Sequence, residues 1–205
     1  MSRLGNYTRV ALPTIGRIAD YIIATHVRDR NARYVLVFMC CGWATTEVVL
    51  AAALQARGLR IGREVYFDRT VGKECLDLLL ARQDEVQRTH EVVLVTHIQS
   101  LHDACGQEDT PLLLFGVNAG FSYMSPNAGL YAQPRDYQLF FDLCERWSAS
   151  GKLSNRKWFN ILEWETVNKN LPLVPFCDRV CVYECAWSSL AAEQVARWHF
   201  VLGES

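Results

Sequence analysis

Four apolar segments of this 205-residue sequence each end beside polar side chains that could bind a ligand. In an open parallel sheet, ligands bind beyond the carboxyl ends of the strands, and an acidic residue ending the second strand can hold ribose hydroxyls. Asp68 ends the second segment, residues 64–68, and is the leading candidate for such a carboxylate. Aspartate is also common where a strand simply meets a turn, so that interpretation stays open. The other candidates follow the first, third and fourth segments: Cys41, Gly42, Thr45, Thr96, His97 and Asn118.

The loop after the first segment argues against a dinucleotide site. A pyrophosphate needs a Gly-x-Gly-x-x-Gly loop so that the backbone can approach it closely. This loop has one glycine, Gly42, and the next residue, Trp43, would crowd a pyrophosphate. S-adenosylmethionine has no pyrophosphate and tolerates fewer glycines, so it remains a candidate cofactor, with Asp68 on the ribose and the Gly42 loop on the amino-acid end.

Cysteine and histidine spacing predicts no metal site. His97, His102 and Cys105 lie five and three residues apart, which does not place them well on one helical face. Cys177, Cys181 and Cys185 fit one side of a strand in the core better than a ligand set. Cys40 and Cys41 form no Cys-x-x-Cys pair, and the sequence has no serine nucleophile elbow, Walker loop, zinc-protease or kinase motif. The familiar enzyme classes that carry those motifs are therefore not expected.

The elements that position these residues alternate between strand and helix. Residues 34–41, 64–68, 91–96 and 112–117 are predicted strands, and the continuous apolar run of the first indicates burial on both faces. Helices are expected after Thr14, after Thr45 or Thr46 up to Gly58, over 72–88, and over 98–105. In the third of these, Cys75, Leu76, Leu79 and Leu80 are expected on one face. This alternation predicts an α/β, Rossmann-like fold of three layers, with a mostly parallel sheet and helices on both faces.

The C-terminal third has a weaker pattern. Residues 118–135 are predicted to form a long loop, 136–149 a helix, 158–162 and 180–183 strands, and 188–200 a terminal helix. Pro172 and Pro175 indicate a loop between the strands. We expect a single domain over 1–205, made of a leading helix in 1–33, a βαβ core in 34–117 and a loop-rich elaboration in 118–205.

Composition limits the choice of partners and compartment. Half of the residues are apolar, and 21 basic residues against 22 acidic ones give a net charge of −1. Nucleic-acid binding needs clustered positive charge, which this sequence lacks. The first thirty residues have no signal-peptide pattern, and no apolar run is long enough to cross a membrane. The eight cysteines fall largely in apolar patterns, so we expect reduced thiols and a cytoplasmic protein.

Three features in order resemble the sensitivity-to-red-light-reduced (SRR-like) family. They are the turn Cys41-Gly42, the strand end Val65-Tyr66-Phe67-Asp68, and Met124-Ser125-Pro126-Asn127 followed by Leu130-Tyr131. The family has a proline after the aspartate where this sequence has Arg69, and its Met-Pro-His-Cys turn is interrupted here. The resemblance implies a regulatory α/β protein, with Asp68 and the 124–131 loop as its functional positions.

Three functions are compatible with these observations. The first is a non-catalytic or regulatory Rossmann-like domain that binds a small nucleoside-type ligand or a protein partner in the crevice beyond the strand ends. The second is a transferase similar to the S-adenosylmethionine-dependent methyltransferases, which needs no conspicuous motif because positioning supplies much of the catalysis. The third is a structural subunit of a larger assembly, with an interface built from the aromatic C-terminal third: Trp147, Trp158, Trp164, Trp187 and Trp198.

Overall fold

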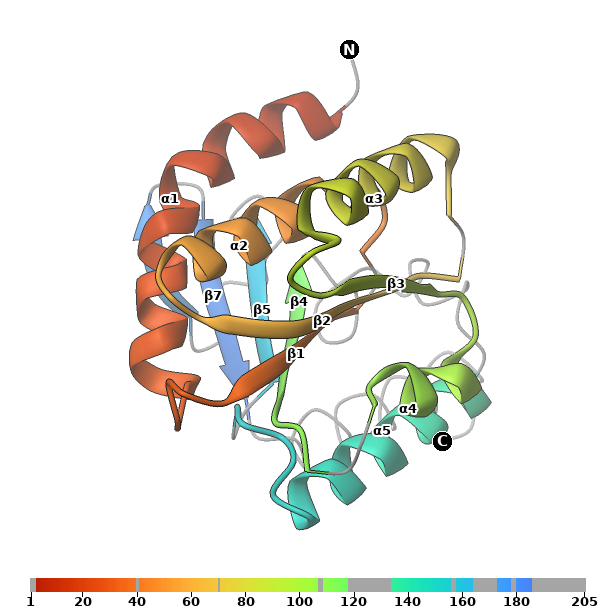
Figure 1. Ribbon diagram of the computed structural model, residues 1–205. Coiled ribbons are helices and arrows are strands. Elements are labelled where there is room, and N and C mark those ends of the chain that lie inside the picture. The colour runs from red at the N-terminus through yellow and green to blue at the C-terminus, as the bar shows by residue number, and fades with distance from the viewer. Residues whose placement is uncertain are drawn as a thin grey trace, which may run out of the picture.

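The computed structural model describes residues 3–39, 41–69, 71–106, 109–117, 134–155, 158–163, 173–177 and 180–185. These residues form a seven-stranded sheet with helices on both faces (Figure 1). The predicted α/β, Rossmann-like fold is therefore confirmed. Of the predicted loop over 118–135, residues 118–133 lie outside the described residues and the last two begin a helix; the predicted helix over 188–200 also lies outside the described residues.

The sheet has the order β3-β2-β1-β4-β5-β7-β6. The first five strands in this order are parallel, and β7 runs antiparallel to both β5 and β6. In chain order, β2 and β3 are added on one side of β1. The next strand, β4, pairs with the other side of β1. The carboxyl ends of β1 and β4 therefore form the switch point where open α/β sheets bind ligands. The strands are β1 (Arg33–Met39), β2 (Arg60–Phe67), β3 (Glu91–Val95), β4 (Leu112–Val117), β5 (Trp158–Glu163), β6 (Leu173–Cys177) and β7 (Val180–Cys185).

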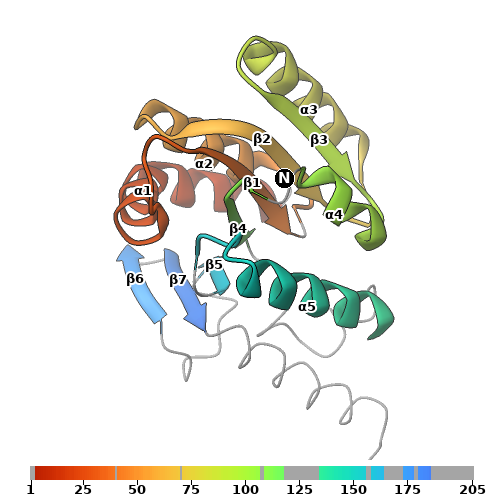
Figure 2. The same ribbon diagram turned by 60° about the horizontal axis from the view of Figure 1, so that its bottom comes forward.

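Two groups of helices cover the two faces of the sheet. On one face lie α1 (Arg3–His26), α2 (Thr45–Ala56) and α3 (Lys73–Val86). On the other lie the 3-10 turn Ile98–Ser100 with α4 (Leu101–Ala104), and α5 (Pro134–Ala149), as Figures 1 and 2 show. Successive residues of β1 enter the two opposite apolar cores, because side chains alternate along a strand. Both faces of β1 are thus buried, as its continuous apolar run predicted.

Long-range contacts hold α1 against the far end of the sheet. The Tyr21 hydroxyl donates to Glu184 Oε1 of β7 at 3.2 Å, and His26 Nε2 lies 2.9 Å from the same oxygen. Phe159 of β5 packs against both the Tyr21 and His26 rings. Figure 2 shows β6 and β7 beside α1, at the opposite end of the sheet from β3.

Several predicted helix boundaries need correction. α1 begins at Arg3, so Thr14 lies inside the helix and does not cap it. The helix continues through Pro13, because one proline removes a single backbone hydrogen bond and can be accommodated by a bend. The predicted end of α2 at Gly58 is confirmed. The Gly58 φ angle is +85°, and its N–H donates to Gln55 O at 2.9 Å while Leu59 N–H donates to Leu54 O at 3.1 Å, a Schellman motif.

The predicted apolar face of α3 was wrong for two of its four residues. Cys75 and Leu79 are buried, but Leu76 and Leu80 are 43% and 65% exposed. α3 covers the outermost part of the sheet, so only one narrow stripe of the helix meets it. The stripe consists of Cys75, Leu79, Arg82 and Val86.

The predicted loop at Pro175 was also wrong. Pro175 lies in β6, the last strand of the sheet, where a missing backbone N–H can face away from the neighbouring strand. The three C-terminal cysteines, which were expected on one strand, belong to two strands. Cys177 ends β6, whereas Cys181 and Cys185 belong to β7.

Among the described residues, the helices are all too short or too polar to cross a membrane.

Residues 152–155 complete the hydrogen bonding of β4 where β5 does not reach. β5 pairs with β4 only from Phe115 onward. At Leu114, the Asn155 side chain takes the place of a strand: Leu114 N–H donates to Asn155 Oδ1 at 2.9 Å, and Asn155 Nδ2 donates to Leu114 O at 2.8 Å. Asn155 is fully buried, so water cannot replace these bonds.

Replacing Asn155 with alanine should therefore lower the free energy of unfolding by about 2 kcal/mol, because two buried backbone groups lose their partners. Urea denaturation measures the change. Asn31→Ala is the matched control, since that asparagine is exposed. Equal effects of the two substitutions would contradict the role assigned to Asn155.

Candidate functional site

The carboxyl ends of β1, β2 and β3 are joined by backbone hydrogen bonds. Cys41 N–H donates to Phe67 O at 3.1 Å, and Asp68 N–H donates to Val95 O at 3.2 Å. Gly42 N–H donates to Asp68 Oδ2 at 2.7 Å. Three of the predicted site residues, Cys41, Gly42 and Asp68, therefore lie together beside the switch point. Asp68 is half-buried there and already orients the loop that follows β1.

The loop from Cys41 to α2 is tight and conformationally strained. Gly42 has a φ angle of +52°, and Ala44 has a φ angle of +59°, which is otherwise not seen for a non-glycine residue in the described part of the chain. Ala44 N–H donates to Cys41 O at 2.7 Å and closes the turn. Left-handed alanine costs of order 1 kcal/mol or more, and such strain is concentrated at functional sites.

Ala44 is also the N-cap residue of α2, and its side chain makes no capping bond. The predicted caps Thr45 and Thr46 were wrong, because both lie inside the first turn of the helix. Another residue of this turn was not selected from the sequence. Glu47 lies at the third position of α2, and the backbone N–H groups of Glu47 and Thr46 act to lower the pKa of its carboxyl group.

Glu47 is an unusual carboxyl group because it is only 4% exposed. Burial raises the pKa of Glu47 to about 8, with smaller contributions from Cys75 and Asp68, against the lowering effect of the backbone N–H groups. A glutamate three residues after an N-cap is one half of a capping box. That signal was present in the sequence, but the other half, a serine or threonine at position 44, is missing.

Two thiols lie beneath the same loop. Cys41 and Cys75 are buried in one apolar cluster. The influence of each thiol on the other is the main cause that lowers the pKa of Cys75 and raises the pKa of Cys41, and burial raises the pKa of Cys41 further. Cys75 follows Glu74 in the first turn of α3, and the sequence analysis had assigned it only a packing role.

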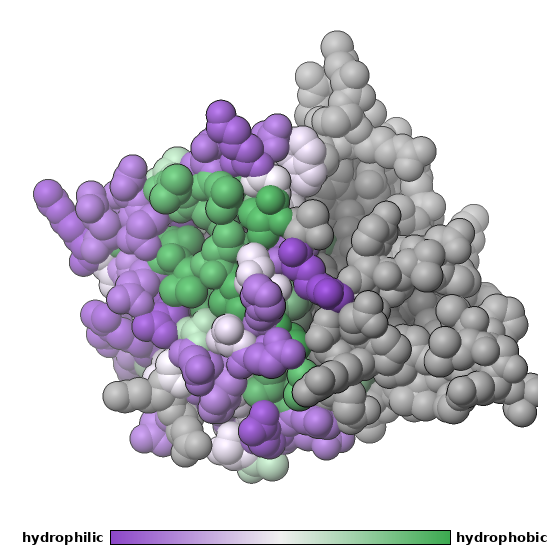
Figure 3. Space-filling view, turned by 90° about the vertical axis from the view of Figure 1, so that its right-hand side faces the viewer, coloured by the Kyte–Doolittle hydropathy of each residue, from purple (hydrophilic) through white to green (hydrophobic). Residues whose placement is uncertain are grey.

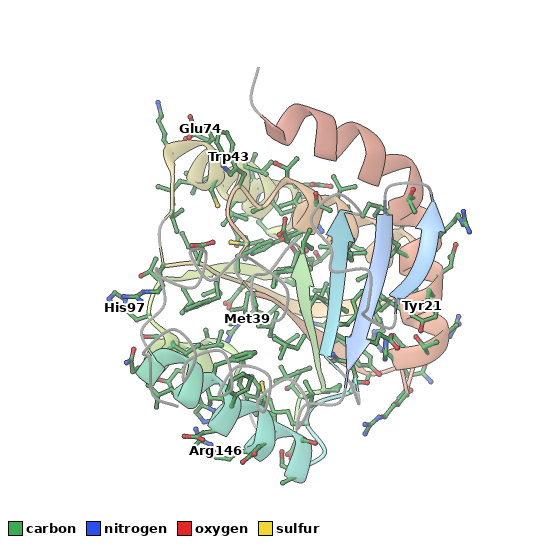
Figure 4. The ribbon with its side chains drawn as sticks, turned by 180° about the vertical axis from the view of Figure 1, so that it is seen from behind. Tyr21, Met39, Trp43, Glu74, His97 and Arg146 are labelled. Carbon is green, nitrogen blue, oxygen red and sulfur yellow. The ribbon has the colours of Figure 1, made fainter. Side chains whose placement is uncertain are left out.

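The rim of the site is apolar and exposed. Trp43 is 46% exposed, and Figure 4 shows it toward the same end of the molecule as Glu74. Figure 3 views the molecule toward this side and shows apolar side chains gathered on its described part. The exposed large apolar side chains among the described residues are Trp43, Leu76 and Leu80.

The remaining predicted site residues contribute less to this arrangement. Thr45 begins α2 and is half-buried. Thr96 and His97 follow β3 and are exposed, with Thr96 Oγ1 3.0 Å from His97 Nδ1. Figure 4 shows His97 at the edge of the molecule, away from Trp43 and Glu74. Asn118 lies outside the described residues.

No group of three histidine, cysteine, aspartate or glutamate side chains in the described ranges has an arrangement that could hold a metal ion. Cys105 is buried, and burial raises its pKa to about 12. The groups described at this edge of the sheet are the Asp68 carboxylate, the loop after β1 and the exposed Trp43 ring.

Two solved structures are distantly similar to this chain. Neither a protein-family model nor a curated protein matches the chain. A crystal structure from Listeria monocytogenes, provisionally named a class I S-adenosylmethionine-dependent methyltransferase, is 11% identical with a TM-score of 0.43, over 85% of this chain and 60% of that one. An uncharacterized ACR superfamily protein from Burkholderia thailandensis is 12% identical with a TM-score of 0.36, over 91% and 62%.

The chain thus spans about three fifths of the length of these two structures. Likenesses of this size support no functional conclusion. The resemblance to the SRR-like family stays a prediction.

Proposed function

We propose that this domain binds a nucleoside that carries no phosphate, of the S-adenosylmethionine type, at the carboxyl edge of its sheet, and that it transfers the methyl group. The observation that supports this most directly is the position of Asp68. Its carboxylate follows β2 and touches the loop after β1, which is where folds of this class hold ribose hydroxyls.

The first turn of α2 favours a ligand without phosphates. Anions bind at helix N-termini because the first backbone N–H groups are unpaired there. In this protein the Glu47 carboxyl group is buried in the first turn of α2, where the backbone N–H groups of Glu47 and Thr46 act to lower its pKa. A phosphate would have to displace a buried acid and would meet the Asp68 carboxylate nearby. Nucleotides and dinucleotides would therefore bind poorly at the N-terminus of α2. A nucleoside without phosphate does not have to bind there.

The charge of the site favours a cation. The Asp68 carboxylate lies at the loop after β1, and its negative charge raises the cost of bringing in a second one. When bound, S-adenosylmethionine supplies an electrophilic methyl group on a positively charged sulfonium. The residues of this chain would hold it: Asp68 by the ribose, the Gly42 turn by the amino-acid end, and Trp43 as an apolar wall.

The sheet order supports the proposal only through the switch point between β1 and β4, where open α/β sheets bind ligands. A fold hosts many functions, so the assignment depends on the Asp68 site and not on the topology. The regulatory function expected from the sequence uses the same crevice without catalysis.

Ligand binding and turnover can be separated experimentally. We expect S-adenosylmethionine and S-adenosylhomocysteine, at about 100 times their dissociation constants, to raise the melting temperature by roughly 5–11 °C, and ATP and NAD to have no effect. Asp68→Asn keeps an oxygen that can accept the Gly42 N–H but loses the charge. It should weaken binding about 10- to 100-fold by calorimetry.

Asp84→Asn, an exposed aspartate of α3, is the matched control and should bind as the unchanged protein does. Binding of either nucleoside without methyl transfer to any acceptor would favour the regulatory function. No binding by the folded protein, or equal binding by Asp68→Asn, would overturn the proposal.

A further inference from the structure

The amino edge of the sheet, opposite the crevice, carries a cluster of arginines from two separate segments of the chain. Residues 28–33, which join α1 to β1, and residues 57–60, which join α2 to β2, contain five exposed arginines and one acidic residue. The two segments are neighbours because β1 and β2 pair in parallel from their first residues. The whole chain has a net charge of −1, so the fold concentrates positive charge at this edge. The arginine cluster consists of Arg28, Arg30, Arg33, Arg57 and Arg60.

Arg33 and Arg60 form the central pair of the arginine cluster. They are register partners at the start of β1 and β2, so their Cα atoms lie about 5 Å apart. Arg60 Nη1 donates to the backbone oxygen of Asn31 at 2.8 Å, which leaves its charge without a carboxylate. Arg33 has no hydrogen bond or ion pair with another described residue. Like charges that face each other on neighbouring strands are destabilising, so this pair costs stability unless an anion binds between the two side chains.

Hydrogen bonds hold the turn that presents these arginines. Ala32 N–H donates to Asp29 O at 3.3 Å, and Asn31 N–H donates to Asp29 Oδ1 at 2.8 Å. The Tyr34 hydroxyl, in a side chain that is only 1% exposed, accepts the N–H of Asp29 at 3.1 Å and donates to Asp29 O at 3.0 Å. The backbone of the turn is therefore fixed before any partner binds. A preorganised site loses less conformational entropy on binding than a flexible one does.

A small pocket lies beside the same turn, between the ends of α1 and α2. Arg30 is exposed at this pocket and has no hydrogen bond or ion pair with another described residue. Arg57 is already neutralised, because its Nε lies 2.6 Å from Asp20 Oδ1. The pocket therefore combines one uncompensated guanidinium with an apolar wall. Its lining residues are Ile23, Val27, Arg30, Arg57, Gly58 and Leu59.

We propose that the Arg33–Arg60 pair binds a phosphoserine or phosphothreonine on a segment of a partner protein. Guanidinium groups bind phosphate oxygens through parallel N–H groups. A phosphate monoester carries nearly two negative charges at pH 7, so it can compensate two adjacent guanidiniums, whereas a carboxylate carries one charge. Both arginines are exposed, so a free phosphate would make few other contacts. A peptide segment can also place a neighbouring side chain in the pocket, which begins at Leu59, directly before Arg60.

Other anionic partners match the arginine cluster less well. The exposed large apolar side chains of the described residues are Trp43, Leu76 and Leu80, and they belong to the loop after β1 and to α3. The cluster therefore has no exposed aromatic ring on which a nucleic-acid base could stack. It also has no exposed large apolar side chain that could enter a lipid bilayer.

The experiment measures the binding of short fluorescein-labelled peptides to the full chain by fluorescence anisotropy. One peptide carries a phosphoserine between two leucines, a second lacks the phosphate, and a third has glutamate in place of the phosphoserine. We expect the phosphopeptide alone to bind, and Arg33→Ala and Arg60→Ala each to weaken its binding about tenfold. Arg33→Lys should not restore full binding, because an ammonium group lacks the planar fork. Arg88→Ala removes an exposed arginine just after α3 and should bind the phosphopeptide as the unchanged protein does.

Four results would overturn the proposal. The first is equal binding of the phosphopeptide and the glutamate peptide, which would show that any acidic segment suffices. The second is unchanged binding by both Arg33→Ala and Arg60→Ala. The third is displacement of the phosphopeptide by an equal concentration of inorganic phosphate. The fourth is tighter binding of a single-stranded RNA or of vesicles that contain phosphatidylserine. The melting temperature of each variant confirms that the fold is present, and none of these readouts involves the proposed nucleoside ligand.

Discussion

Replacing Glu47 with glutamine should increase the free energy of unfolding at pH 8 by about 3–5 kcal/mol. The pKa of Glu47 is raised from about 4.5 in the unfolded chain to about 8 in the folded protein, mainly by burial. The unfolded chain therefore gives up this proton at a lower pH than the folded protein does. The stability that the protonated group contributes is fully present below pH 4.5 and is lost as the pH rises through 8. Glutamine is never charged and can still accept the N–H groups at the start of α2.

Urea denaturation at pH 5, 6.5 and 8 measures this effect. In the unchanged protein the free energy of unfolding should fall across the series, and Glu47→Gln should remove most of that fall. Glu74→Gln is the control, because Glu74 occupies the first turn of α3 but is exposed. An equally steep fall in Glu47→Gln would show that another group causes it.

Replacing Arg82 with methionine should lower the free energy of unfolding by about 3–5 kcal/mol. Arg82 Nη2 donates to Glu64 Oε1 at 2.7 Å, and both side chains are completely buried between α3 and β2. Removing the guanidinium leaves a buried carboxylate without its compensating charge. The Tyr66 hydroxyl, at 2.7 Å from Glu64, and His90 Nε2, at 2.8 Å, keep their contacts with the carboxylate, but the bidentate guanidinium is lost.

The double variant tests that reason. Glu64→Gln combined with Arg82→Met removes both charges and keeps an oxygen for Tyr66 and His90. It should recover a large part of the stability lost in the single variant, by guanidinium chloride denaturation. Arg88→Ala, an exposed arginine just after α3, should have little effect. A double variant less stable than Arg82→Met would contradict the uncompensated charge as the cause.

The Glu64 network should also make the protein sensitive to acid. Burial alone raises the pKa of Glu64, but hydrogen bonds from its three partners outweigh burial and hold the pKa below its ordinary value. The ionised group therefore stabilises the folded protein above pH 4.5, and that contribution is lost as the pH falls below this value. Glu64 and Glu47 thus act in opposite pH ranges.

The sequence by itself determined the strands of the core and the position of Asp68. β1 and β4 are buried on both faces, so their residues had to be apolar without interruption, and the pattern is visible without knowledge of their neighbours. Asp68 follows β2 directly, and the carboxyl ends of parallel strands meet at one edge. Gly58 has a left-handed backbone conformation, which glycine adopts at a lower energetic cost than residues with a side chain do, so its position after α2 was visible in the sequence.

Only the tertiary structure decided the strand order, the burial of Glu47 and the burial of the Arg82–Glu64 ion pair. Each depends on segments that are distant in the sequence, and the spacing of residues carries no information about which segments become neighbours. Pro175 was predicted in a loop because a proline disrupts an inner strand, but β6 is an edge strand, and that place follows from the assembled sheet. The local pattern of apolar and polar residues shows whether a segment is a helix or a strand and which of its faces are buried. The neighbours of a given side chain depend on how the helices and strands pack together.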